Sequence, residues 1–227
     1  MDNQQKLVKG FTLVEMAVVL VIAGLLLGGL LVPLSAQLEQ RNISETRSSL
    51  GQIKDALIGF AILYGRLPCP STEVNPANAN YGLEDATCSG AAAADGYLPW
   101  KTLGVAETDA WGIKRTLPTS LWTGYWRYRV DRNFSSPTPF TLSTAFSADA
   151  LMVRDNAGNN LASITERPIA IVVSTGKNVT PDGQNASYEP VGGIYESNDL
   201  SATFDDFVVW ISRPQLMNRM VAAGKLP

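Results

Sequence analysis

The sequence predicts an α+β protein in which a long N-terminal helix packs on an antiparallel β-sheet. Three patterns support this fold class: an apolar run over residues 11–34, an amphipathic continuation to residue 64, and short strand-like segments further on. We therefore divide the 227 residues into a leader (1–10), an apolar helix (11–34), its amphipathic continuation (35–64) and one globular domain (65–227).

The apolar run over residues 11–34 contains one charged side chain, Glu15. At about 1.5 Å per residue, a helix of this length would span roughly 30 Å of hydrocarbon. Lys6 and Lys9 precede the run, so we expect the N-terminus in the cytoplasm and the globular domain outside it. An unpaired carboxylate near the end of such a helix costs about 2–3 kcal/mol, which makes Glu15 a candidate functional residue.

The residues around the start of this run, Lys9-Gly10-Phe11-Thr12-Leu13-Val14-Glu15, resemble the leader junction of type IV pilins and pseudopilins. The resemblance implies that a prepilin peptidase cleaves between Gly10 and Phe11 and that the new Phe11 amine is N-methylated. It also implies that Glu15 of one subunit neutralises the Phe11 ammonium of its neighbour in a filament, as a desolvated charge pair.

The same resemblance implies a function and a location. The chain would be a structural subunit, a minor pilin or a pseudopilin, of a type IV pilus or a type II secretion filament. Its partners would be other pilins, the peptidase, the inner-membrane assembly platform and the membrane. The chain would cross the inner membrane once and would then join the filament in the periplasm or at the cell surface. The alternative is an adhesin-like tip subunit that binds a surface ligand or secreted cargo.

Two simpler interpretations of the N-terminus remain open. A secretory signal has an apolar core of roughly 7–15 residues and a small-residue cleavage site. This run is longer, and its best such site, Leu34-Ser35-Ala36, is poor. A plain membrane anchor would have no use for Glu15.

The helix is expected to continue through the amphipathic segment to residue 64. Its predicted buried face follows steps of three and four residues, and Gly65 with the prolines beyond it predicts the end. The members of that face are Ile43, Thr46, Leu50, Ile53, Leu57, Phe60 and Tyr64.

Beyond the helix, residues 71–96 read as a long polar loop, which a disulfide between Cys69 and Cys88 would close. The chain-entropy value of such a loop is about 3 kcal/mol, and two free thiols are the alternative. Strands are predicted at 122–130, 140–146, 169–174 and 207–211, a turn at 155–159 and a short helix at 213–223.

Composition excludes several functions. The chain has no His, so Ser-His and Cys-His hydrolase chemistry is absent, and we predict no enzymatic activity. The net charge is −3, and because the leader carries Lys6 and Lys9 against Asp2, a mature chain would carry −4. Nucleic-acid binding is therefore not expected. The alternation of Arg with aromatic residues at 125–129 fits a half-buried strand instead.

A second resemblance concerns metal binding. Asp109-Ala110-Trp111-Gly112, followed much later by Asp205-Asp206 before Trp210, resembles the major pseudopilin of type II secretion, in which a C-terminal acidic loop binds calcium. The resemblance implies Asp205 and Asp206 as ligands, with Asp182 and carbonyl groups near Ser174 as further candidates. The alternative is that Asp205 and Asp206 cap a turn. No other cofactor is expected.

Overall fold

The computed structural model describes residues 10–85, 95–187 and 193–226; within them, the side chains of 27–34, 95 and 187 are not described. Cys88, most of the leader and the loop residues 188–192 lie outside these ranges. The chain forms two compact units, residues 1–42 and 43–227.

Helix α1 (Leu13–Tyr64) begins and ends close to the predicted positions. It ends where Gly65 adopts a φ of +72° and donates its N–H to the carbonyl oxygen of Ala61. A Cβ atom at Gly65 would come within 2.8 Å of Cβ of Pro139, so both the backbone conformation and the packing require glycine here.

Within the described residues, no helix is both long and apolar enough to cross a membrane.

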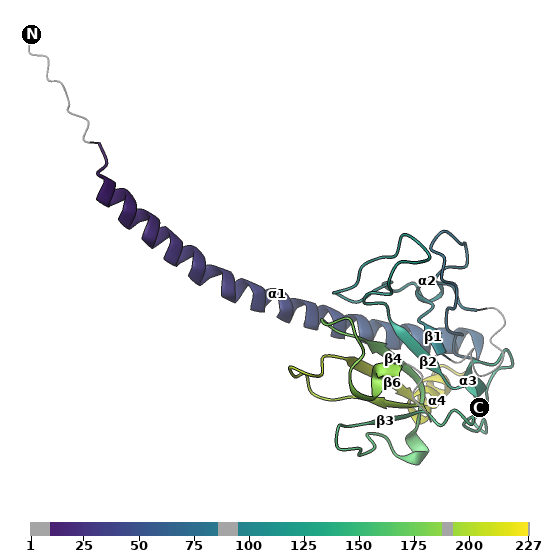
Figure 1. The fold of residues 1–227 in the computed structure, drawn as a ribbon. Coiled ribbons are helices and arrows are strands. Elements are labelled where there is room, and N and C mark those ends of the chain that lie inside the picture. Colours follow the sequence, from purple (N-terminus) through teal and green to yellow (C-terminus); the bar gives the residue numbers. More distant parts are fainter. Residues whose placement is uncertain (1–9, 86–94, 188–192, 227) are drawn as a thin grey trace, which may run out of the picture. The chain divides into compact units, whose positions relative to one another are not determined.

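A four-stranded antiparallel sheet forms the centre of unit 43–227 (Figure 1). Its strands lie in the order β1 (Asp95–Tyr97), β2 (Arg127–Val130), β4 (Pro168–Ser174) and β6 (Phe207–Ser212). Strands β2, β4 and β6 lie within or next to the predicted segments, whereas β1 lies at the end of the segment read as a loop.

The strand predicted at residues 140–146 is wrong. Within this segment Phe140 is buried and Phe146 is partly buried. Thr141 and Thr144 form a local turn, in which Thr144 N donates to Thr141 O and Thr141 N donates to the Thr144 hydroxyl. Hydroxyl groups that bond to nearby backbone groups compete with strand pairing, which explains why the alternating pattern misleads.

Different elements pack on the two faces of the four-stranded sheet. On one face, Ile169 and Val172 of β4 join the main core with residues 43–64 of α1. On the other face, Ile171 and Val173 contact a second, parallel sheet made of β3 (Met152–Arg154) and β5 (Ile194–Glu196). Burial on both faces explains why β4 reads as an unbroken apolar run.

The predicted buried face of α1 is largely confirmed within residues 43–64. Thr46, Leu50, Ile53, Leu57 and Phe60 are buried. Tyr64, however, is 59 % exposed, and Ile58 and Ala61 are buried in its place. The predicted pattern has a period of 3.5, but an α-helix has 3.6 residues per turn, so the buried stripe drifts around the helix.

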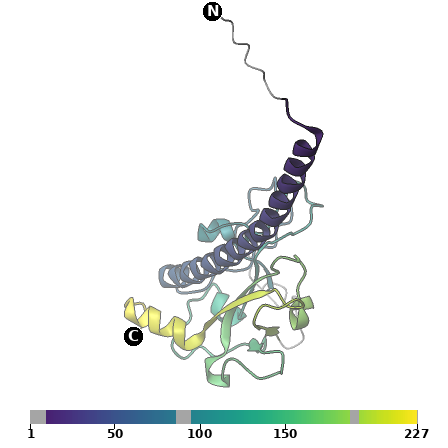
Figure 2. The ribbon, with the colours of Figure 1, turned by 90° about the vertical axis from the view of Figure 1, so that its left-hand side faces the viewer.

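Short helices connect the strands. These are α2 (Trp100–Leu103), α3 (Arg132–Ser135) and the 3₁₀ turns η2 (Ile164–Glu166) and η3 (Gly183–Ser187). The C-terminal helix α4 (Arg213–Ala222) confirms the predicted one and continues directly from β6 (yellow in Figure 2). The Ser212 hydroxyl caps α4 by accepting from Gln215 N.

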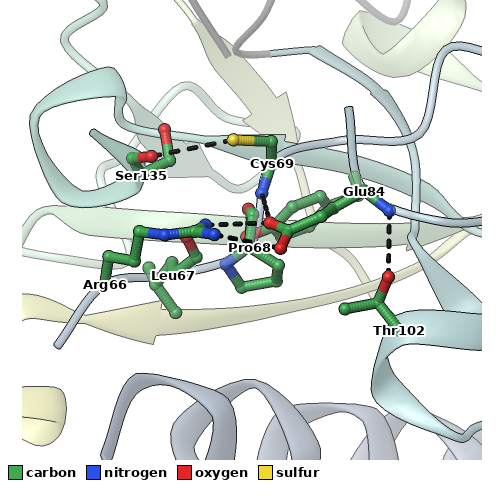
Figure 3. A network of polar contacts seen from close by, with 8 residues as sticks. Arg66, Leu67, Pro68, Cys69, Glu84, Thr102 and Ser135 are labelled. Carbon is green, nitrogen blue, oxygen red and sulfur yellow. Dashed lines mark hydrogen bonds and ion pairs between the residues drawn. The ribbon is translucent and has the colours of Figure 1, made fainter. Parts of the chain in front are cut away.

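An ion pair secures the corner that follows α1 (Figure 3). The guanidinium of Arg66 donates to both carboxylate oxygens of Glu84, at 2.8 and 3.0 Å. Glu84 also accepts from Cys69 N, and its own N–H donates to the Thr102 hydroxyl. The polar loop is thus held to the domain at Glu84, four residues before Cys88 in the sequence.

Candidate functional site

The predicted processing junction lies at the start of unit 1–42. Gly10 and Phe11 precede α1, and Phe11 is 76 % exposed. A Cβ atom at Gly10 would meet nothing within 4 Å. Packing within the described chain therefore does not require glycine at position 10.

Glu15 has a local partner that the sequence interpretation missed. Its Oε2 accepts from Thr12 N at 3.0 Å and from the Thr12 hydroxyl at 3.1 Å, while Glu15 N donates to the same hydroxyl at 3.2 Å. This reciprocal pattern is a capping box, whose sequence signature Thr-x-x-Glu is present at residues 12–15. Thr12 and Glu15 thus cap the start of α1 within a single chain.

The structure brings together the three carboxylates predicted as metal ligands. One oxygen each from Asp182, Asp205 and Asp206 lies within 4.8 Å of the other two. Asp205 and Asp206 precede β6, and Asp182 precedes η3. We call these three residues the acidic triad.

Backbone amides fix the triad. Asp182 N donates to Asp206 Oδ2 at 2.9 Å, and Asp205 N donates to Asp182 Oδ2 at 2.8 Å. Asn178 N donates to Asp205 Oδ2 at 2.9 Å. These bonds occupy one side of each carboxylate and hold the two parts of the loop together.

Two oxygens of the triad are left buried without a hydrogen-bond partner among the described residues: Oδ1 of Asp205 and Oδ1 of Asp206. Asp206 is 2 % exposed, and its burial raises its pKa to about 7. Burial also raises the pKa of Asp205. Buried carboxylate oxygens without donors are costly, and a bound cation would satisfy them.

The triad fits a hard cation such as calcium better than a soft metal. All of its donors are carboxylate oxygens, the ligands that calcium prefers; the chain has no His, and no Cys of the described residues belongs to the cluster. Asp182, Asp205 and Asp206 would hold the ion, and main-chain carbonyls or water would complete the six to eight ligands that calcium usually takes.

The motif at residues 109–112 forms a turn joined to the triad by β4. Asp109 accepts from Trp111 N at 2.9 Å and from the Ser174 hydroxyl, at the end of β4, at 2.6 Å. The Ser174 hydroxyl in turn accepts from Gly176 N. Gly176 has a φ of +59°, and a Cβ there would come within 2.2 Å of the carbonyl oxygen of Asp205.

Sequence reasoning missed Asn185, whose side chain is fully buried beside the triad. Its Nδ2 donates to Asp206 Oδ2 at 3.0 Å and to the carbonyl oxygen of Glu196 at 2.9 Å, and its Oδ1 accepts from Glu196 N. A lone Asn in a polar loop gives no sequence signal for this position, because its partners Glu196 and Asp206 follow it by 11 and 21 residues.

The remaining candidate residues are the cysteines. Sγ of Cys69 lies 3.7 Å from the carbonyl oxygen of Ser135 (Figure 3). Cys88 lies outside the described residues, so its pairing with Cys69 stays a prediction.

Comparison with known proteins identifies the N-terminal segment. Residues 5–31 match the family described as "Prokaryotic N-terminal methylation motif". No curated protein and no solved structure matches the chain. The matched family is structural rather than enzymatic, and its motif implies assembly with other pilins and recognition by prepilin peptidase in general. The predicted resemblance is confirmed, and the motif supports a protein of the type IV pilin-like or pseudopilin class.

Proposed function

We propose that the chain is a minor pilin or pseudopilin, processed between Gly10 and Phe11, that joins a pilus or secretion filament through residues 11–34. The proposal includes a single membrane crossing by residues 11–34 before assembly, with the N-terminus in the cytoplasm. The methylation motif is the observation that carries it.

The surface of unit 1–42 supports assembly. Large apolar side chains of α1 are exposed in the single chain, from Leu13 at 91 % and Val14 at 72 % to Leu25 at 72 % and Leu26 at 61 %. Water is a poor environment for such a continuous apolar surface, whereas lipid and the interior of a helical filament are suitable ones. The apolar helix therefore has two compatible environments, used in succession.

Two roles of Glu15 must be separated, because the capping box already gives its carboxylate a partner. As a cap, Glu15 needs hydrogen-bond acceptors, which Gln also provides. As the partner of a neighbouring Phe11 ammonium, Glu15 needs its negative charge. Glu15→Gln removes the charge and retains the cap, whereas Glu15→Leu removes both.

The experiment compares these two variants with the wild type in cells that assemble filaments. We expect both variants to reach the membrane, and both to be poorly recovered with sheared filaments, because the loss of one partner from a desolvated pair costs roughly 3–5 kcal/mol. Thr12→Val is the matched control, since it weakens the capping box and keeps the charge.

The outcome assigns the role. Recovery of Glu15→Gln at the wild-type level, with loss of Glu15→Leu and Thr12→Val, would assign Glu15 to capping alone. Wild-type recovery of all three variants would reject a role for Glu15 in assembly.

A specific observation favours a second function, calcium binding by the acidic triad. Two buried carboxylate oxygens that lack a hydrogen-bond partner within the described part of the chain lie in a cluster whose three acidic groups repel one another when ionised. We propose that calcium stabilises the loops that carry Asp182 and Asp205–Asp206. Calcium should therefore raise the thermal unfolding temperature of the chain, and Asp206→Asn should reduce this effect.

A further inference from the structure

A polar cavity of about 610 Å³ lies beside β3 and β5 in unit 43–227. Its walls come from the turn after β3, from Gly183 and from residues 196–204. Among the described residues, the lining combines carboxylates, carboxamides and one aromatic ring, and it includes no Lys or Arg. The members used below are Asp155, Asn156, Glu196, Asn198, Asp199 and Phe204.

The carboxylates of Asp155 and Glu196 already receive N–H donors. Glu196 is 8 % exposed, and it accepts from Gln184 N at 2.9 Å and from the side chain of Asn198. Asp155 accepts from the backbone and side-chain N–H groups of Asn159. Each carboxylate oxygen has a second lone pair, so both groups remain acceptors held in a fixed orientation. Because these N–H groups partly neutralise the negative charge of Asp155 and Glu196, the two carboxylates do not need a bound cation.

The walls of the cavity are tied together. Asn156 N donates to Asn198 Oδ1 at 2.8 Å, which joins the turn after β3 to the segment after β5. Behind Glu196, the buried side chain of Asn185 bonds to both backbone groups of Glu196. A cavity held in this way loses little conformational entropy when a ligand binds.

We propose that this cavity binds a neutral sugar. Sugar hydroxyl groups donate to oriented carboxylates, and adjacent hydroxyl groups match the paired donor and acceptor of a carboxamide such as Asn156. Phe204, which is 6 % exposed, adds a small apolar contact for the C–H groups of a sugar ring. The acidic lining disfavours anionic sugars. This binding function goes beyond the role of filament subunit and requires neither assembly nor calcium.

Saturation-transfer NMR on the full-length chain tests the proposal. The chain is held in micelles of a zwitterionic detergent, which lacks sugar headgroups, with EGTA present. The probes are maltose, cellobiose and N,N′-diacetylchitobiose. We expect transfer to the ring protons of at least one disaccharide, with a Kd on the order of 1 mM, as a few hydrogen bonds allow.

The test variant is Asn156→Ala with Asp199→Ala, two exposed residues whose replacement leaves the buried bonds of Glu196 in place. It should weaken binding about tenfold, because two hydrogen-bonding groups are lost. Asp55→Ala, an exposed carboxylate on α1, is the matched control and should bind as the wild type does. Unfolding curves confirm that all three proteins are folded.

Three results would overturn the proposal: no transfer to any of the three disaccharides, equal transfer in the wild type and the double variant, or binding of the polycation spermidine in place of the sugars. The last result would identify a cation-binding cavity. None of these results bears on filament assembly, which the Glu15 variants test separately.

Discussion

Asp206 shows how the burial of one carboxylate couples pH to stability. Its pKa in the folded chain is raised from 3.8 to about 7, so the folded state binds this proton more tightly than the unfolded state does. The stabilisation is complete below about pH 4 and is lost as pH rises towards 7. At about 1.4 kcal/mol per pKa unit, the effect is up to about 4 kcal/mol.

We therefore predict that the metal-free chain is less stable at about pH 8 than at about pH 5, and that calcium raises the unfolding temperature more at the higher pH. Burial raises the pKa of Asp109 to about 6, which acts in the same direction. Thermal unfolding with calcium or EGTA at both pH values measures the effect. Asp149, whose pKa Arg132 lowers to about 2, titrates below this range and does not contribute.

Asp206→Asn is the informative variant for this site. It removes one charge from the triad, so in EGTA it should be at least as stable as the wild type at about pH 8, and it should lose most of its calcium response. A calcium response equal to that of the wild type would show that the ion binds elsewhere. Magnesium is the ionic control, because it favours a more rigid, octahedral site and should stabilise less.

Glu84 offers a second prediction for a single residue. Its removal takes the carboxylate acceptor away from the Cys69 N–H and from the Arg66 guanidinium, which is 21 % exposed and keeps, within the described residues, only its hydrogen bond to the carbonyl oxygen of Leu67. We expect Glu84→Ala to lower the free energy of unfolding by about 1–3 kcal/mol. Glu166→Ala, at an exposed position, is the control and should change stability by less than about 0.5 kcal/mol. Chemical denaturation of both variants, with the cysteines kept oxidised, makes the comparison.

Among the elements, residues 43–64 of α1 contribute Leu50, Ile53, Leu57, Ile58 and Ala61 to the core of their unit. Ile53 is 1 % exposed within that core, whereas Leu63 on the same helix is 73 % exposed. We expect Ile53→Ala to cost about 2–5 kcal/mol and to lower the unfolding temperature by on the order of 10 °C. Leu63→Ala should be nearly neutral, and similar losses from both variants would contradict the packing described.

Elements with a strong local signal were predictable from the sequence. The long helix, β4 and β6 are continuous apolar or periodic runs, and α4 has its own cap. By contrast, β1, β3 and β5 are three residues each and are defined by their partners, since Asp95–Tyr97 pairs with β2 and Met152–Arg154 pairs with β5. A segment this short has too few residues to show a period.

The candidate sites divide in the same way. Asp205 and Asp206 are adjacent and close to a strand, and a resemblance pointed to them and to Asp182; the structure places all three together. The hydrogen bonds around these carboxylates could not be predicted. Asn185 bonds to Asp206 and Ser174 bonds to Asp109, and in each case the partner is distant in the sequence and is brought near only by the fold. At the N-terminus, the spacing of Thr12 and Glu15 is a capping-box signature that predicts their hydrogen bonds. The resemblance to pilins implies a different role for Glu15, which is pairing between subunits.

At the scale of the whole molecule, the proposed function depends on cleavage between Gly10 and Phe11. Nothing in the packing of the described chain requires glycine at position 10, so a requirement for Gly10 would come from the peptidase that recognises the junction. Gly10→Leu should therefore reach the membrane, keep its leader and fail to enter filaments. The wild type should yield a mature chain that begins at Phe11 and carries one added methyl group, as intact-mass measurement of membrane-extracted protein would show. Gly10→Ala is the graded control, because alanine has the smallest side chain after glycine, and we expect this variant to be processed more slowly rather than not at all.

A mature chain beginning at Gln37 would instead identify residues 1–36 as a secretory signal. In that case the soluble chain would lack Phe11 and Glu15, and it could not assemble by the pairing proposed.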